Sequence, residues 1–371
     1  MSLSTGKRFI KLVTELPGPK SSRILERKKN LIPRSFASLA PVVIERAEGA
    51  LVVDVDGNQF LDMTGGMGVL NVGHTPGKIV RSIQQQAEKF LHTDFSLIPY
   101  EVYINLAEQL LSFIPGPSEK KVAFFNTGAE AVENAVKIAR KATGKRGIIA
   151  FEGAFHGRSY MALSLTSKYK PYKSGFGPFA SEVYRAPYPD VYRCPFGSQD
   201  EAECLERTLN WLERMMTTHV SAEETAALIV EPVLGEGGFV VPPRGFLRGL
   251  RDFCDRHEIL LIIDEIQTGF GRTGLMFAVE HEGVEPDLML LAKSLAAGLP
   301  LSAVVGRADL MDAPAEGELG GTYPGNPLAC AAALEVLELF REQNLLANAR
   351  SLGEQIKSFW LEMSGRHEFV G

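Results

Sequence analysis

The sequence lacks long apolar runs, has few cysteines and shows no broad concentration of positive charge. No stretch approaches the roughly 20 apolar residues that span a bilayer, and the first residues lack the apolar segment of a secretion signal. The four cysteines are scattered, without a CxxC pair or a histidine at metal-ligand spacing. The net charge is −6, with acidic and basic residues interspersed. We therefore expect a cytoplasmic protein with reduced thiols, no metal site, and neither a membrane nor a nucleic acid as partner.

Several common catalytic signatures are also missing. The pair Asp264-Glu265 follows an apolar strand, as the magnesium-binding acid of an ATPase does, but no GxxxxGK[ST] loop is present to hold a triphosphate. The segment Gly66-Met-Gly-Val-Leu-Asn71 lacks the third glycine of a dinucleotide fingerprint. Neither GxSxG nor HExxH occurs. These absences argue against nucleotidases, NAD enzymes, serine hydrolases of the α/β type and zinc peptidases.

What the sequence does contain, from residue 121 onward, is an alternation of apolar strands and amphipathic helices. The 371 residues, 45% of them hydrophobic, suffice for one large and one smaller domain. Helices are expected at 129–142 and 246–257, and strands at 122–125, 147–151, 226–230, 259–263, 288–291 and 302–305. This pattern predicts an α/β fold with a mostly parallel sheet covered by helices on both faces. Ligands of such sheets bind beyond the carboxyl ends of the strands.

Outside this alternation the sequence is less regular. Residues 51–62 predict a hairpin around Asp56-Gly57-Asn58, and residues 168–199, rich in proline, glycine and aromatics, predict an ordered excursion over the surface. The basic first 34 residues suggest an arm that is solvated or lies on a partner subunit. Further helices are expected at 76–90, 101–113, 326–340 and 345–363, and the last four residues, 368–371, resemble the start of a strand.

Lys293 and Asp264 are the most informative residues, because both follow predicted strands. A lysine amine can bind an aldehyde cofactor covalently, and a carboxylate at a strand end can keep a pyridine nitrogen protonated. Taken singly, such residues are more often a surface lysine and an ordinary acid. Together they indicate pyridoxal phosphate.

Two glycine-containing turns are suited to a phosphate group. In the first, Gly128 and Ala129 open a helix directly after a strand, where backbone amides and the helix dipole favour an anion. In the second, the segment 320–327 offers the Thr322 hydroxyl beside free amides. A glycine needed only for the turn is the alternative at the first position.

Two further loops carry side chains that suit a ring and a carboxylate. Phe155, in Phe155-His156-Gly157-Arg158, could lie flat on a heteroaromatic ring, and Arg158 could bind a substrate carboxylate with paired hydrogen bonds. Glu231 and Glu236 lie on a glycine-rich loop and could orient a cofactor. A core aromatic and a solvated arginine are the simpler interpretations of Phe155 and Arg158.

In their order along the chain, these motifs resemble those of class III (ω-amino acid) aminotransferases, and most of all the 4-aminobutyrate enzymes among them. The resemblance runs from about residue 35 to the end. It rests on the segments Asn126-Thr-Gly-Ala-Glu-Ala-Val-Glu-Asn-Ala, Phe155-His-Gly-Arg, Glu231-Pro-Val-Leu-Gly-Glu-Gly-Gly, Asp264-Glu-Ile-Gln-Thr-Gly-Phe-Gly-Arg-Thr-Gly, Ala292-Lys-Ser and Gly321-Thr-Tyr-Pro-Gly-Asn-Pro.

The resemblance implies fold type I of the pyridoxal-phosphate enzymes and a role for each motif. Lys293 would bind the cofactor and move a proton between it and the substrate, and Asp264 would hold the ring nitrogen protonated. Thr322 would reach the phosphate of the neighbouring subunit, in a homodimer or tetramer with the site at the interface. The other implied cofactor contacts are Gly128 and Ala129 at the phosphate, Phe155 on the ring, Gln267 at the phenolic oxygen, and His156 and Glu231.

For substrates, the resemblance implies an ω-amino acid as donor and a 2-oxo acid as acceptor. Arg158 would bind the distal carboxylate, Met67 and Ile98 would form pocket walls, and Glu236 would pair with an arginine of the C-terminal segment. The implied reaction moves the amino group of 4-aminobutyrate, or a similar compound, to 2-oxoglutarate in a ping-pong cycle through pyridoxamine phosphate. Alternatives are an acetylornithine or 5-aminovalerate transaminase, a racemase or epimerase on the same fold, and a non-catalytic binding module.

The resemblance also suggests how the chain divides into domains. Residues 1–75 would form an N-terminal arm and part of a small domain, 76–320 the large cofactor-binding domain, and 321–371 the start of a C-terminal small domain. The chain ends before the family segment that supplies the arginine partner of Glu236. On this basis we expect Glu236 to lack that partner, and we expect either poor cofactor binding or slow turnover.

Overall fold

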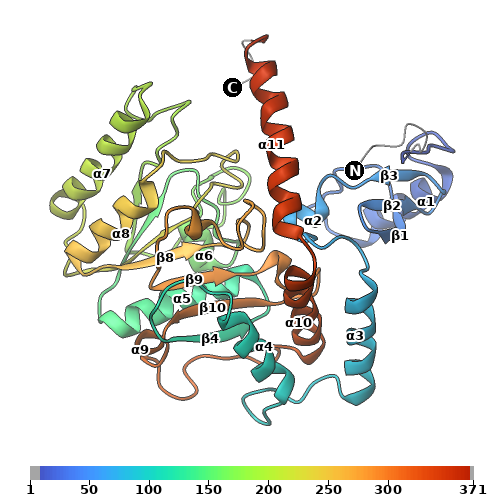
Figure 1. Ribbon diagram of the computed structural model, residues 1–371, viewed down its shortest axis with the longest axis horizontal. Coiled ribbons are helices and arrows are strands. Elements are labelled where there is room, and N and C mark those ends of the chain that lie inside the picture. Colours follow the sequence, from blue (N-terminus) through green and yellow to red (C-terminus); the bar gives the residue numbers. More distant parts are fainter. Residues whose placement is uncertain (1–8, 368–371) are drawn as a thin grey trace.

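The computed structural model describes residues 9–367, so the predicted strand start at 368–371 lies outside the described residues. Within them, a seven-stranded sheet in the order β4-β10-β9-β8-β7-β5-β6 forms the centre of the molecule (Figure 1). Strand β10 runs antiparallel to β4 and β9, and the other neighbouring strands are parallel, which confirms the predicted mostly parallel sheet. The strands are β4 (Lys120–Phe125), β5 (Gly147–Phe151), β6 (Val183–Ala186), β7 (Thr225–Val230), β8 (Leu260–Asp264), β9 (Leu288–Leu291) and β10 (Ser302–Arg307).

Helices cover both faces of this sheet. Successive side chains of a strand point to opposite faces, so Ile262 packs in the cluster that contains α5 (Gly128–Thr143), whereas its neighbour Ile263 packs in the cluster with α8 (Phe246–His257) and α10 (Pro327–Glu342). Fully burying one such aliphatic side chain contributes roughly 1.5–3 kcal/mol. The two-sided burial explains why the strands are apolar at nearly every position.

The N-terminal part forms a small antiparallel sheet of β1 (Ile44–Glu48), β2 (Leu51–Asp54) and β3 (Gln59–Leu61), which lies apart from the large sheet in Figure 1. The predicted hairpin is confirmed as β2 and β3. Its turn residue Asp56 also accepts hydrogen bonds from the amides of Lys20 and Ser21, at 2.7 and 2.8 Å. These amides start helix α1 (Pro19–Leu31), which the sequence interpretation as an arm missed because the cap comes from a distant turn.

The remaining elements connect and surround these sheets. Strand β6 and helix α7 (Glu201–Thr218), which the sequence analysis did not anticipate, lie at one edge of the large sheet. Helix α11 (Leu345–Ser364) projects from the body (Figure 1). The others are α2 (Gly65–Gly68), α3 (Gly77–Lys89), α4 (Glu101–Leu111), α6 (Tyr160–Leu165), α9 (Ala308–Met311) and the 3₁₀ turns η1 (Ala278–His281) and η2 (Lys293–Ala296).

Among residues 9–367, no helix combines the length and apolar character needed to cross a membrane. The division into domains stays a prediction.

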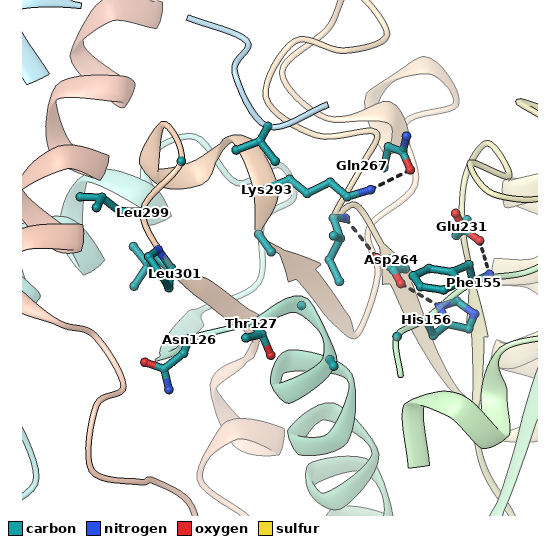
Figure 2. Close-up of a pocket in the computed structure, with 18 residues that line it drawn as sticks. Asn126, Thr127, Phe155, His156, Glu231, Asp264, Gln267, Lys293, Leu299 and Leu301 are labelled. Carbon is teal, nitrogen blue, oxygen red and sulfur yellow. Dashed lines mark hydrogen bonds and ion pairs between the residues drawn. The ribbon is translucent and has the colours of Figure 1, made fainter. Parts of the chain in front are cut away.

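The carboxyl ends of β4, β5, β7, β8 and β9 meet at one edge of the sheet, since these strands run in the same direction. Strand β10 runs the other way and starts at this edge with Ser302. The segments that leave or enter the strands here surround a cavity (Figure 2).

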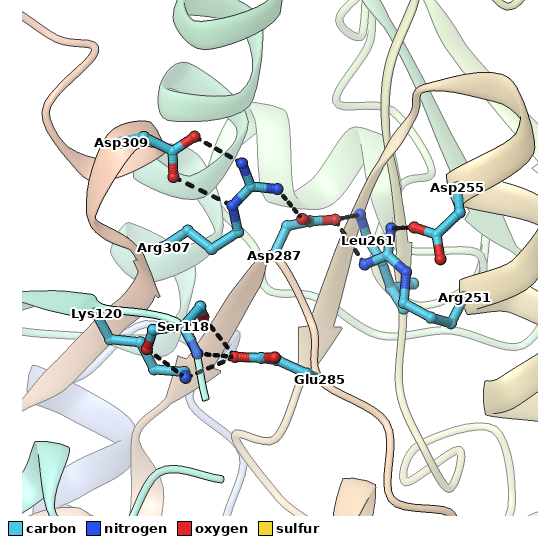
Figure 3. Close-up of polar contacts among 9 residues, drawn as sticks. All are labelled: Ser118, Lys120, Arg251, Asp255, Leu261, Glu285, Asp287, Arg307 and Asp309. Carbon is cyan, nitrogen blue, oxygen red and sulfur yellow. Dashed lines mark hydrogen bonds and ion pairs between the residues drawn. The ribbon is translucent and has the colours of Figure 1, made fainter. Parts of the chain in front are cut away.

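At the opposite edge, a buried carboxylate joins neighbouring strands (Figure 3). Asp287, just before β9, accepts a hydrogen bond from the Leu261 amide of β8 at 2.7 Å. It also pairs with Arg251 of α8 at 2.7 Å and with Arg307 of β10 at 3.1 Å. Arg307 in turn pairs with the exposed Asp309. Asp287 is 5% exposed, so these donors compensate a charge that is largely shielded from water.

Replacing Asp287 with alanine is expected to destabilise the protein by about 3 kcal/mol, because the largely buried Arg251 would lose its buried ion-pair partner. The matched control Asp309→Ala removes a carboxylate from the same network at the surface and should cost less than about 1 kcal/mol. Urea unfolding followed by circular dichroism measures both. Equal unfolding midpoints for the two variants would contradict a structural role for the buried pair.

Candidate functional site

A cavity of about 310 Å³ lies at the carboxyl edge of the large sheet. It is lined by residues that follow β4, β5, β7, β8 and β9 and by the segment that precedes β10. The lining residues are Val69, Asn126, Thr127, Gly128, Ala129, Phe155, His156, Gly157, Glu231, Asp264, Ile266, Gln267, Ala292, Lys293 and Gly298 to Leu301.

Lys293 is the first residue of η2 and extends into this cavity toward Gln267 (Figure 2). Its Nζ donates a hydrogen bond to Gln267 Oε1 at 2.7 Å. The backbone of Lys293 has φ 41°, a left-handed conformation that is costly for a residue with a side chain. Burial lowers the pKa of Lys293, although the negative charge of Asp264 opposes the shift. A larger fraction of the amine is therefore uncharged and nucleophilic at neutral pH than for a solvated lysine.

Asp264 ends the central strand β8 and is 3% exposed. Its Oδ2 accepts a hydrogen bond from His156 Nδ1 at 2.7 Å, and its Oδ1 accepts one from the Ile266 amide at 3.0 Å. The His156 amide donates to Thr166 Oγ1 at 3.0 Å, which fixes the ring beside the carboxylate. Asp264 is thus a buried anion in a fixed orientation at the cavity wall, suited to a cationic ring N–H.

Glu231 joins two of the loops that form the cavity. Its carboxylate accepts hydrogen bonds from the Phe155 amide at 2.8 Å and from the Gly235 amide at 3.0 Å. Burial raises the pKa of Glu231 to about 7, and the nearby His156 opposes this shift. Because both oxygens are used by backbone amides, Glu231 positions Phe155 as a wall of the cavity.

The start of α5 forms an anion cradle on the other side. Thr127 caps the helix by accepting the Glu130 amide at 3.2 Å, and the preceding amides of Gly128 and Ala129 have no partner inside a helix. A Cβ on Gly128 would lie 2.9 Å from Ile266 Cδ1, so glycine permits the close approach of this helix to the loop after β8. Free amides at the start of a long helix suit a phosphate group.

The family model of class-III aminotransferases matches residues 34–371. The chain belongs to this family. It is 49% identical to a probable 4-aminobutyrate aminotransferase of Bacillus subtilis, over 88% of this chain and 74% of the relative. It is 45% identical to the 5-aminovalerate aminotransferase DavT of Pseudomonas aeruginosa, over 94% of this chain and 80% of the relative. The taurine:2-oxoglutarate aminotransferase of Bifidobacterium kashiwanohense, solved with pyridoxal phosphate and glutamate, has a TM-score of 0.87 at 28% identity, covering 94% and 79% of the chains.

This class-III aminotransferase is a pyridoxal-phosphate-dependent transaminase of fold type I, as the sequence motifs predicted. The residues on the cavity wall fit the cofactor. Lys293 supplies a buried amine for its aldehyde, Asp264 an oriented carboxylate for its ring nitrogen, and the α5 start free amides for its phosphate. Which individual side chains bind the cofactor stays a prediction.

The structure gathers most of the predicted site residues around one cavity. Gly128, Ala129, Phe155, His156, Glu231, Asp264, Gln267 and Lys293 all line it. Arg158 and Glu236 lie outside the lining, beside Phe155 and Tyr172. Met67 is 63% exposed and Thr322 is also exposed, and neither lines the cavity of this chain. The action of Thr322 on a neighbouring subunit stays a prediction.

Sequence reasoning missed several residues around the cavity. Ile266 and Val69 are apolar, and the segment Leu299 to Leu301 carries no polar side chain, so no chemical signal distinguished them from core residues. Tyr172 lies in the irregular segment 168–199, where no motif pointed to it. Asn126 and Thr127 were within the quoted turn motif, where the capping pattern of Thr127 and Glu130 was a usable signal.

Replacing His156 with leucine should lower turnover about ten- to hundredfold, because Asp264 loses a charge-assisted hydrogen bond worth roughly 1.5–3 kcal/mol. Retention of the cofactor during dialysis, followed by its visible absorbance, should fall as well. The control His219→Leu changes an exposed histidine and should behave as the parent chain. Unchanged turnover and cofactor retention in His156→Leu would exclude a positioning role.

Glu265, behind the cavity, is expected to make stability depend on pH. It is fully buried, accepts the Val279 amide at 2.9 Å and the Thr268 hydroxyl, and burial raises its pKa from 4.5 to about 7. The protonated form is favoured in the folded state, so its contribution is present below pH 4.5 and is lost as the pH rises to 7. A pKa difference of this size corresponds to roughly 3 kcal/mol.

The measurement is urea unfolding of the parent chain and of Glu265→Gln at several pH values between 4.5 and 8. The stability of the parent relative to the glutamine variant should decrease across pH 4.5–7 and then level off. A difference that stays constant with pH would show that Glu265 titrates normally.

Proposed function

We propose that this transaminase transfers the amino group of 4-aminobutyrate, or of an ω-amino acid of similar length, to 2-oxoglutarate in a ping-pong cycle. The observation that carries the proposal is the buried Lys293 amine within the same cavity wall as the oriented Asp264 carboxylate. The relatives named for 4-aminobutyrate and 5-aminovalerate support the donor class. The neighbour named for taurine and 2-oxoglutarate supports the acceptor.

When bound, pyridoxal phosphate supplies an electron sink and carries the amino group between the two half-reactions. Lys293 Nζ acts as the base that removes the proton from the substrate carbon bearing the amino group, and later returns a proton. Its lowered pKa suits this exchange, since a proton shuttle works best when its pKa lies near the working pH. Gln267 Oε1 accepts a hydrogen bond from this amine and so orients it.

Asp264 and His156 act as a unit on the other side of the cavity. The carboxylate would stabilise a protonated ring nitrogen of the bound cofactor, and the His156 Nδ1–H hydrogen bond keeps the carboxylate in place. Since Asp264 is buried, its charge acts in a medium that screens it weakly. The same wall positions Phe155 through Glu231.

Arg158 is the residue that we assign to the distal carboxylate of the donor. It lies beside Phe155, with its Cζ 6.0 Å from the ring centre, at the margin of the cavity. An arginine presents paired donors to a carboxylate, whereas a simple alkyl amine has no group for it to bind. The existence of a DavT relative at 45% identity makes 5-aminovalerate the second candidate donor.

The test is an assay of glutamate formation from 2-oxoglutarate with 4-aminobutyrate, 5-aminovalerate and acetylornithine as separate donors. We expect 4-aminobutyrate or 5-aminovalerate to give the highest kcat/KM. Lys293→Ala should lower turnover by about a thousandfold or more, because it removes both the covalent anchor and the base. The control Lys357→Ala changes an exposed lysine of α11 and should leave activity unchanged.

Glutamate formation from none of these donors would contradict the proposed substrate class. Loss of optical rotation from an L-amino acid incubated alone would instead indicate a racemase. Full activity of Lys293→Ala would place the catalytic amine elsewhere.

A further inference from the structure

Tyr172 lies where side chains from separate loops converge beside the cavity. Its hydroxyl donates a hydrogen bond to Glu236 Oε2 at 3.0 Å. Its ring lies 5.2 Å from the ring of Phe155, and the Arg158 guanidinium carbon is 5.0 Å from its ring centre. One phenol therefore contacts both the basic and the acidic residue that the sequence analysis assigned to substrate binding.

The residue that follows Tyr172 anchors it firmly. Lys173 is 9% exposed, and its Nζ donates to the carbonyl oxygen of Thr166 at 2.9 Å and faces the Phe179 ring at 5.0 Å. The Thr166 hydroxyl accepts the His156 amide. The loop that carries Tyr172 is thus attached to the same framework that fixes His156 against Asp264.

The hydroxyl of Tyr172 remains a donor at neutral pH. Burial and the hydrogen bond to Glu236 raise the pKa of Tyr172, while the charge of Arg158 opposes the shift. The Arg158 guanidinium lies against the Phe155 and Tyr172 rings, and it also acts on the Tyr172 hydroxyl through its charge and a hydrogen bond. A guanidinium has five N–H donors, so stacking on these rings leaves donors on its edge for a carboxylate.

Glu236 is a carboxylate that contacts the same phenol as Arg158 does. Glu236 and Arg158 both interact with the Tyr172 phenol, so both lie next to it. The two side chains carry opposite charges. An ion pair between them would occupy the edge of the guanidinium that a substrate carboxylate needs. The hydroxyl of Tyr172 donates a hydrogen bond to Glu236, while the face of its ring lies against the Arg158 guanidinium.

We propose that Tyr172 is a specificity-determining residue that keeps Glu236 from pairing with Arg158 and so preserves a binding site for the distal carboxylate of the donor. This inference rests on the proposed function, because it concerns how an ω-amino acid is distinguished from an amine without a carboxylate. Tyr172 acts through Arg158 and Glu236 and takes no part in proton transfer.

The first experiment compares Tyr172→Phe with the parent chain on donors with and without a carboxylate. The variant keeps the ring but frees Glu236, so the KM for 4-aminobutyrate should rise about fivefold, while the KM for butylamine should change less than about twofold. The matched control Tyr169→Phe alters an exposed tyrosine of the same loop and should change neither value. A similar rise for both donors would overturn the proposal.

The second experiment tests the competition directly. Adding Glu236→Gln to Tyr172→Phe removes the competing charge, so the double variant should recover most of the lost affinity for the carboxylate, and the single variant Glu236→Gln completes the cycle. Additive effects of the two substitutions would contradict the proposed coupling.

A binding measurement separates this inference from the proposed function. Calorimetric titration of the holoenzyme with butyrate, an unreactive carboxylate, should show about fivefold weaker binding to Tyr172→Phe and recovery in the double variant. If the parent enzyme binds butyrate in this way but converts no ω-amino acid, the proposed function fails and the role of Tyr172 stands. Equal butyrate affinity in the parent and Tyr172→Phe overturns the role of Tyr172.

Discussion

The hydrogen bond between His156 and Asp264 is the interaction on which the rest of the site depends. It joins the loop after β5 to the end of β8, at the centre of the parallel sheet. A buried carboxylate is stable only when donors compensate its charge, and here His156 and the Ile266 amide do so without closing the side that faces the cavity. The sheet thereby presents a fixed negative charge at its carboxyl edge.

The other half of the site is Lys293, whose pKa is subject to opposing electrostatic effects. Burial favours the neutral Lys293 amine, and the carboxylates of Asp264 and Glu231 favour the charged form. The positive φ of Lys293 places its side chain along the cavity toward Gln267. Strain at one residue is tolerated because Leu291, two residues before it, is locked in the sheet core and Ser294, immediately after it, donates to the Gly68 carbonyl at 3.0 Å.

Buried acids also hold the frame around Asp264 and Lys293. Glu231 connects the loops after β5 and β7, and Glu265 connects the loop after β8 to the turn η1. Asp287 joins β8, β10 and α8 at the far edge of the sheet. Each uses backbone amides or arginines as partners, so strand β8, which ends in Asp264, and strand β9, which precedes Lys293, are held in place. A site that must keep a cofactor ring and the Lys293 amine in fixed relative positions needs such a rigid support.

The sequence by itself determined the alternating strands and helices, the mostly parallel sheet, the family and the position of Asp264 and Lys293 at strand ends, because apolar periodicity and motif order can be read directly along the chain. Only the tertiary structure decided that β10 is antiparallel, that Asp56 caps α1, that His156 contacts Asp264, and that Tyr172 stands between Arg158 and Glu236. These contacts join residues from 14 to 108 positions apart, or depend on strand direction. No local pattern encodes them, since they arise when the sheet brings distant loops to one edge.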